Sequence, residues 1–278
     1  MKEFGIQIFS VRDHLTTEED IIACYKEIKE MGYSHIHTAS YHNFPAKFLK
    51  EAADKFGLTY CGTHYSWDKI CNDIEGTIEE HKTLGTTNIG IGGMPADARD
   101  SIEALEAFIA KFNELAAIYN KHGFKLTYHN HSFEFVKLED GKTLFDHLVE
   151  GLDPKTTSFV LDTHWVQHGG ADVRATIERL KGRIDILHIK DMEACHKTTY
   201  NTITVVDGEP QIKKITVSAP AITEIGAGNI NFKDIIPLAE KCGVKYFVVE
   251  DDRAPATGDS YAAVKRSADY IKANLLNL

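Results

Sequence analysis

The sequence has no cluster of basic residues, no long apolar run and no cysteine pattern typical of a disulfide framework. Its formal net charge is −10, which disfavours an anionic nucleic-acid backbone as a partner. No apolar run approaches the roughly 20 residues that a membrane-crossing helix needs. We therefore expect neither a nucleic-acid partner nor a membrane partner.

The five cysteines are odd in number and include no C-x-x-C pair. This pattern indicates reduced thiols in a cytoplasm-like compartment. The opening residues, MKEFGIQIF, lack the shape of a signal peptide. The expected location is the cytoplasm, although a leader removed from the amino terminus is compatible with the same sequence.

The first strand-like run is followed by SVRDH rather than by a glycine-rich phosphate loop. What the chain does contain is a regular alternation of short apolar runs with amphipathic segments. The strand-like runs are FGIQIFS, SHIHTA, LTYCGTH, TNIGIGG, KLTYHNH, SFVLDTH, IDILHIK and KYFVVED. Eight such runs in a chain of this length predict an α/β protein with a closed (β/α)8 TIM barrel. A doubly wound open sheet is the alternative, which the missing loop disfavours.

The sequence also predicts where two of the helices end, and it contains one segment that breaks the alternation of strands and helices. A helix is predicted to start after Thr17 and to end at Gly32, and the longest helical pattern closes at Gly123. Residues 192–220 alternate around Asp207-Gly208, which predicts a β-hairpin inserted after the seventh strand. In a barrel this hairpin would lie on the catalytic face as a lid or as the contact of a homodimer. With no linker or low-complexity tract, residues 1–278 are predicted to form one domain.

Polar residues follow four successive strand-like runs, in YHNHSFE, LDTHW, LHIKD and VVED. In a TIM barrel these ends converge on one mouth. The converging residues are Glu134 or His129/His131, then Asp162, His188 and Glu250. One acid after a strand is usually a turn or cap residue, but four in succession favour a shared metal site. Oxygen-rich sites with one imidazole suit Mn²⁺, Mg²⁺ or Co²⁺, with Zn²⁺ as a further option.

The chain resembles the xylose isomerase-like TIM barrels of the sugar phosphate isomerase/epimerase group, which includes ketose 3-epimerases and inosose dehydratases. The residues that carry the resemblance are GIQIFSVRD, YHNHSFEF, FVLDTHWVQHGG, LHIKDM, EIGAGNINFKDI and VVEDD. Together they cover nearly the whole chain and specify the superfamily, not a substrate. The resemblance implies one divalent ion held by Glu, Asp, His and Glu from four strands, of which the last three match Asp162, His188 and Glu250.

The first ligand does not match directly. Many relatives have a glutamate where this chain has His129, before Asn130 and His131. We favour Glu134 as the ligand because it keeps the ligand charge, with His129 as the alternative. The resemblance also assigns catalytic acid and base roles to Glu134 and Glu250; if Glu134 is unsuited, His129 or His131 could take the proton.

Further residues near the strand ends are predicted to contact substrate. These candidates are His64, His129, His131, His164, Trp165, Lys190 and Arg12. The alternatives are a structural histidine at His64, a solvated lysine at Lys190 and an ion pair at Arg12. The remaining histidines are interpreted as structural or solvated: His35, His37, His42, His81, His122, His147 and His196. Asp251 and Asp252 are interpreted as loop acids.

The predicted function is a divalent-metal-dependent isomerase or epimerase of a small keto-sugar or polyol. It would abstract a proton next to a carbonyl through a metal-stabilised enediolate. The alternative is a dehydratase or lyase acting on a keto-inositol or 3-keto-sugar, which shares the opening step. A barrel that binds sugar without turnover comes next, and a nuclease is disfavoured by charge and by ligand count. Neutral substrates are preferred because no basic cluster lies at the strand ends.

Overall fold

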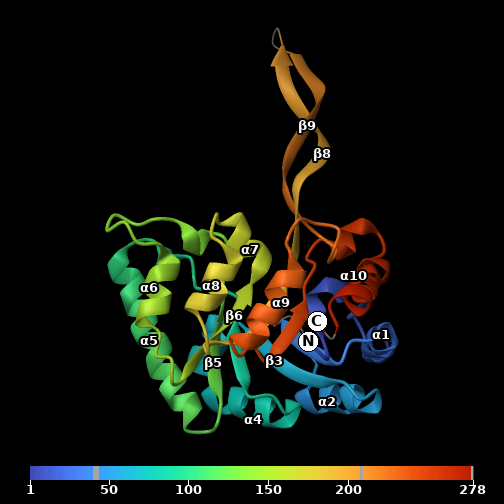
Figure 1. Cartoon of the computed structure of the whole chain (residues 1–278). Helices are drawn as coiled ribbons and strands as arrows, with labels where there is room; N and C mark the ends of the chain where they lie inside the picture. The colour runs from blue at the N-terminus through green and yellow to red at the C-terminus, as the bar shows by residue number, and fades with distance from the viewer. Residues whose placement is uncertain (40–43, 207–208, 277) are drawn as a thin grey trace.

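Eight parallel strands close into a barrel in the order β1-β10-β7-β6-β5-β4-β3-β2. The computed structural model describes residues 1–39, 44–206, 209–276 and 278, so the predicted turn at Asp207-Gly208 and His42 lie outside the described residues. The barrel strands are β1 Gly5–Gln7, β2 His35–Ala39, β3 Thr59–Tyr65, β4 Asn88–Ile91, β5 Lys125–His129, β6 Thr157–Asp162, β7 Ile184–Ile189 and β10 Tyr246–Val249. The predicted (β/α)8 barrel is therefore confirmed (Figure 1).

Helices surround the barrel, as Figure 1 shows. They are α1 Glu18–Met31, α2 Ala46–Lys55, α3 Trp67–Asn72, α4 Ile74–Leu84, α5 Ile102–Asn120, α6 Leu144–Gly151, α7 Thr163–His168, α8 Val173–Arg179, α9 Phe232–Lys241 and α10 Ser260–Asn274. Short 3-10 helices occur at η1 Ile8–His14, η2 Asp97–Arg99, η3 Phe133–Phe135 and η4 Ala254–Thr257. Among the described helices, none is long and apolar enough to cross a membrane.

The ends of α1 are those that the sequence predicts. The Thr17 hydroxyl accepts a hydrogen bond from the amide of Asp20, and the Asp20 carboxylate accepts one from the amide of Thr17. This reciprocal cap satisfies two amides that the helix itself leaves free. Gly32 follows with a φ of 104°, which ends the helix. In contrast, α5 ends at Asn120 rather than at Gly123, because a turn fills the residues between them.

A small apolar layer fills the barrel interior. It consists of Cys61, Val160, Ile186 and Val248, which are all buried. Gly62 lies beside it, where an added Cβ would come within 2.7 Å of the Ile186 side chain and 3.2 Å of the His37 ring. Glycine at this position therefore leaves room for the Ile186 side chain and the His37 ring inside the barrel.

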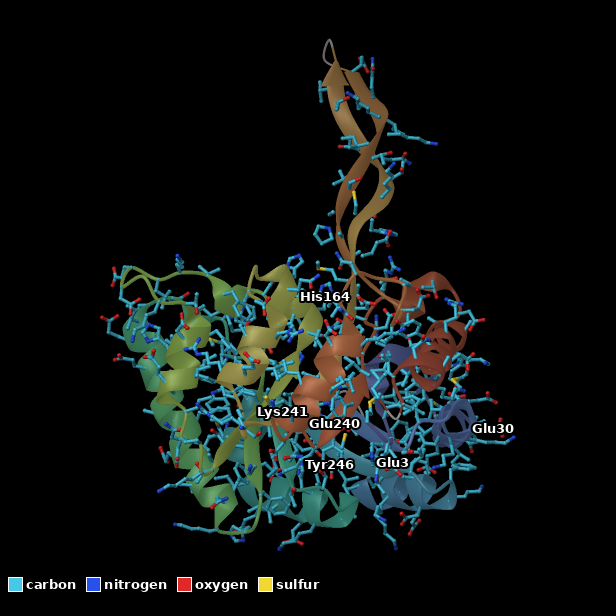
Figure 2. The ribbon with its side chains drawn as sticks, in the orientation of Figure 1. Glu3, Glu30, His164, Glu240, Lys241 and Tyr246 are labelled. Atoms are coloured by element: carbon cyan, nitrogen blue, oxygen red, sulfur yellow. The ribbon has the colours of Figure 1, made fainter. Side chains whose placement is uncertain are left out.

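The predicted hairpin insertion is present and extends slightly beyond the predicted residues 192–220. Strands β8 Asp191–Val206 and β9 Glu209–Thr223 form an antiparallel pair, here called the arm, which projects far from the barrel (Figure 1). Its base is fixed by the Asp191 carboxylate, which accepts hydrogen bonds from the amides of Gly226, Gly228 and Ile230. Figure 2 places His164 at the end of the barrel from which the arm emerges, and Glu3 and Tyr246 at the other end.

Candidate metal centre

Four side chains from neighbouring strands meet at the carboxyl end of the barrel. His129 and Asp162 are the last residues of β5 and β6, His188 is near the end of β7, and Glu250 follows β10. The strand register aligns them, because Asp162 pairs with His188, and His188 in turn pairs with Val248, two residues before Glu250. The four side chains therefore point into the same end of the barrel from the consecutive strands β5, β6, β7 and β10.

The distances between these groups suit a common cation. Nε2 of His129 lies 3.5 Å from Oδ2 of Asp162 and 3.9 Å from Oε2 of Glu250. Nδ1 of His188 lies 2.9 Å from the same Glu250 oxygen and 3.8 Å from the same Asp162 oxygen. One donor atom from each residue falls within 4.8 Å of all the others, and all four residues are buried.

Two of these atoms have no hydrogen-bond partner although they are buried: Nε2 of His129 and Oδ2 of Asp162. Burying a polar atom without a hydrogen bond costs free energy. A ligand that bound both atoms would remove this cost, so the arrangement favours ligand binding. The other oxygen of Asp162 accepts a hydrogen bond from the amide of Trp165 at the start of α7. That contact turns Oδ2 toward the cluster. These residues fit a metal ion.

The first predicted ligand lies elsewhere. Glu134 sits in η3, and its carboxylate accepts hydrogen bonds from the Tyr128 hydroxyl at 2.8 Å and from the amide of His131 at 2.7 Å. Glu134 is not part of the cluster. His129, the alternative ligand, takes the fourth position beside Asp162, His188 and Glu250. The physical reason is position: His129 still belongs to β5, whereas the chain has turned into η3 by Glu134. Burial raises the pKa of Glu134 to about 7.

His37 contacts the ring nitrogen of His188 that faces away from Glu250. Nδ1 of His37 lies 2.8 Å from Nε2 of His188 and 3.2 Å from Nε2 of Gln7. Burial and the neighbouring His188 keep the pKa of His37 well below its ordinary value. Burial alone would lower the pKa of His188, but Glu250 and Asp162 raise it to about 9. The sequence interpretation of His37 as structural or solvated missed this contact; its place within the strand-like run SHIHTA was the available signal.

Lys190 is buried beside the cluster. Its ammonium group lies 3.1 Å from Oε2 of Glu250, 3.5 Å from Oδ2 of Asp162 and 2.8 Å from Oδ2 of Asp252. Burial would raise the pKa of both Asp162 and Glu250, but Lys190 holds each of them well below its ordinary value. A metal ion would share oxygens with this ammonium group, and Asp252 gives the lysine a separate partner. The solvated-lysine alternative is thus wrong, and Asp252 is more than a loop acid.

A pocket of about 500 Å³ opens above the cluster. The predicted site residues that line it are His64, His129, His131, Lys190 and Glu250. Nε2 of His64 and Nδ1 of His131 are buried without a hydrogen-bond partner, and the latter lies 4.0 Å from Oε1 of Glu134. Burial, with smaller effects from His129 and Lys190, lowers the pKa of His131 to about 3. At neutral pH its imidazole is therefore uncharged.

Sequence reasoning also missed several residues that line this pocket, among them Gln7, Phe9, Trp67, Arg99 and Asp252. Arg99 stacks on Phe133, with its guanidinium carbon 3.5 Å from the ring centre, and donates a hydrogen bond to the Met94 carbonyl. Most of these residues reach the pocket from loops and short helices after the strands, where no strand-end pattern marks them.

Three predicted substrate contacts lie beside the pocket rather than on its wall. Arg12 donates hydrogen bonds to the carbonyls of Phe9 and Asp252, so it holds the loop after β10 rather than an acidic side chain. His164 is buried in α7, and burial lowers its pKa to about 4. Trp165 packs near the lysine, whose nitrogen lies 5.0 Å from the indole ring.

Comparisons with known proteins find similar sequences and a similar fold. The chain is 23% identical over 272 residues to an inosose dehydratase of Geobacillus thermodenitrificans, covering 90% of this chain and 88% of the relative. It is 25% identical over 273 residues to an inosose dehydratase of Mesomycoplasma hyopneumoniae, with 88% and 86% covered. A sugar phosphate isomerase/epimerase from Parabacteroides distasonis shares the fold, with a TM-score of 0.77, 21% identity, and 99% and 94% covered.

The family described as xylose isomerase-like TIM barrel matches residues 25–274. This range includes the four clustered residues and all of the barrel strands except β1. The chain belongs to the xylose isomerase-like TIM barrel family.

Proposed function

We propose that this chain is a divalent-metal-dependent enzyme that removes a carbon-bound proton next to the carbonyl group of a small polyhydroxylated ketone. The observation that supports this most is the cluster of His129, Asp162, His188 and Glu250 beside the pocket, in which two buried atoms make no hydrogen bond. A pocket of about 500 Å³ is suited to a single sugar or cyclitol ring.

The four clustered residues would hold the ion. Two imidazoles and two carboxylates form a more nitrogen-rich donor set than the sequence suggested, which favours Mn²⁺, Co²⁺ or Zn²⁺ over Mg²⁺. When bound, the ion supplies a Lewis acid that polarises a carbonyl oxygen. Side chains of this protein would carry out the proton transfers.

Glu250 is the best-placed proton acceptor, because its carboxylate lines the pocket and stays ionised beside Lys190. The Lys190 ammonium group, whose pKa is raised mainly by Glu250 and Asp162 against the effect of burial, remains a donor at neutral pH. It can therefore stabilise a developing oxyanion and can protonate a departing hydroxyl group.

Between the two outcomes of this first step, the geometry favours loss of water. Epimerisation by two carboxylates on opposite faces of the substrate would use Glu134 and Glu250, but Glu134 is buried below the Tyr128 hydroxyl and does not line the pocket. One base and one acid suffice for dehydration. The similarity to inosose dehydratases supports the same reading, so we propose a dehydratase of a keto-inositol or related keto-sugar.

Epimerisation is the second candidate, and His131 favours it. The residue lines the pocket with Glu250 and its imidazole is uncharged at neutral pH, so it could remove a proton from the substrate while Lys190 returns one. In that case the product would have the composition of the substrate and an inverted carbon centre.

The test is proton NMR in heavy water with metal-loaded protein and a set of inososes and 3-keto-sugars. A dehydratase yields an unsaturated or enolic product that has lost water, whereas an epimerase yields deuterium at an inverted centre. Glu250→Gln is expected to slow either reaction by at least about 100-fold. Glu224→Gln, which alters a surface carboxylate paired with Arg266, is the matched control. Absence of reaction with every substrate and metal would leave the barrel as a binding protein and reject the proposal.

A further inference from the structure

The arm carries most of the exposed apolar side chains of the described chain. Among the large hydrophobic residues described as exposed, Ile203, Val205, Ile212 and Val217 belong to the arm. Ile203, Val205 and Ile212 are 72%, 71% and 75% exposed. Isolated two-stranded hairpins are marginally stable in water, so a long apolar hairpin without support is expected to have a partner.

These side chains share one face near the tip. Ile203 pairs directly with Ile212, and Val205 pairs with Pro210. Side chains two residues apart on a strand point to the same side, so the four residues form one apolar patch. We call Ile203, Val205, Pro210 and Ile212 the tip patch.

The two outer edges of the arm differ. Residues 197–206 of β8 read KTTYNTITVV, which is rich in β-branched residues and contains one charge and no proline. Strand β9 instead contains Pro210 and Pro220 with Lys213 and Lys214. Proline and lysine protect an exposed edge from pairing, so β9 is protected and the edge of β8 is open to another strand.

We propose that the open edge of β8 pairs with β8 of a second copy of this chain, forming a four-stranded sheet that joins two barrels. Antiparallel pairing of a strand with itself about a two-fold axis is self-complementary, which is the requirement for a closed dimer. The same axis keeps the two tip patches on one face of the joined sheet. This inference concerns assembly and does not depend on the proposed reaction.

Charge favours contact through the arms over contact between barrels. The segment 197–218 contains three lysines, one aspartate and one glutamate, a net charge of +1, which leaves −11 for the rest of the chain. Two such bodies repel each other at short range. A strand of 16 residues extends about 50 Å, several times the screening length of about 8 Å at physiological ionic strength. Arm-to-arm pairing therefore holds the acidic barrels apart.

The test uses light scattering coupled to size exclusion at about 1–100 µM protein, a range over which dimers of ordinary affinity form. The full chain is expected to be a dimer. A short-arm variant replaces residues 197–218 with Asn-Gly, which closes a two-residue turn because His196 and Ala219 are cross-strand partners. This variant is expected to be a monomer with an unchanged melting temperature.

A milder variant keeps the arm and alters only the tip patch. Ile203→Thr with Val205→Thr and Ile212→Thr preserves β-branched residues but removes apolar surface, and should raise the dimer dissociation constant at least about tenfold. Val136→Thr, at an exposed apolar residue outside the arm, is the matched control and should change nothing.

Hydrogen exchange identifies the surface involved. Amides of residues 197–206 are expected to become more protected as the protein concentration rises, while the outer amides of β9 do not. A full chain that stays monomeric throughout, a dimer that survives arm shortening, or protection confined to the barrel would each overturn the proposal.

Discussion

Nδ1 of His188 lies 2.9 Å from Oε2 of Glu250, while Nε2 of the same ring lies 2.8 Å from Nδ1 of His37. The imidazole is therefore held at both nitrogens, by the cluster on one side and by β2 on the other. Outer partners of this kind fix the orientation of a metal-binding ring. His37 acts on the site through His188, which makes it a positioning residue.

Replacing His37 with phenylalanine removes this support while keeping a ring of similar size. We expect the affinity for the divalent ion to fall about 10- to 100-fold, as is typical when an outer partner is lost. Metal titration followed by intrinsic fluorescence measures the change without relying on turnover. His35→Phe, two residues earlier on the same strand and hydrogen-bonded to Thr59 outside the site, is the control. Equal affinities for both variants would show that His37 is only a packing residue.

His129 and Glu134 compete for the role of first ligand, and substitution separates them. Because Nε2 of His129 faces Asp162 and Glu250 without another partner, His129→Ala should abolish stoichiometric metal binding. Glu134→Gln should retain one ion per chain, because Glu134 is hydrogen-bonded outside the cluster. Elemental analysis of both dialysed proteins gives the answer. The reverse result would restore Glu134 as the ligand.

Lys190 balances three carboxylates, and its loss leaves them uncompensated. Lys190→Met should lower turnover at least about 100-fold, because the proposed proton donor is gone. The metal-free variant should also lose about 3–5 kcal/mol of unfolding free energy, the usual cost of breaking a buried ion pair. Added metal is expected to restore part of that loss. Lys125→Met, at the opposite end of the barrel beside Asp185, is the control. Wild-type turnover in Lys190→Met would exclude the lysine from the reaction.

The buried carboxyl group of Glu134 is expected to make the stability of the fold depend on pH. Burial raises its pKa from an ordinary value of 4.5 to about 7. The folded state thus binds this proton more tightly than the unfolded state, so stability from this group is present below pH 4.5 and is lost as pH rises toward 7. The loss is about 3 kcal/mol. Denaturant titrations of wild type and Glu134→Gln between pH 4.5 and 8 should diverge by that amount, and parallel curves would contradict the burial effect.

Local residue patterns are enough to predict the fold and three of the four clustered residues. The alternation of strand and helix patterns predicted the barrel, and a barrel brings successive strand ends together, so Asp162, His188 and Glu250 could be placed without coordinates. The cap at Thr17 and the hairpin insertion were also predictable, because they depend on local residue pattern.

The remaining features depend on the exact position of a turn or on contacts between residues that are distant in sequence. Whether His129 or Glu134 faces the cluster depends on where β5 ends and η3 begins, a boundary that pattern leaves uncertain by several residues. His37 reaches His188 across 151 residues of sequence, and Lys190 reaches Asp252 across 62. Such pairings arise because closing the barrel brings β2, β7 and β10 around one interior, which no local pattern encodes.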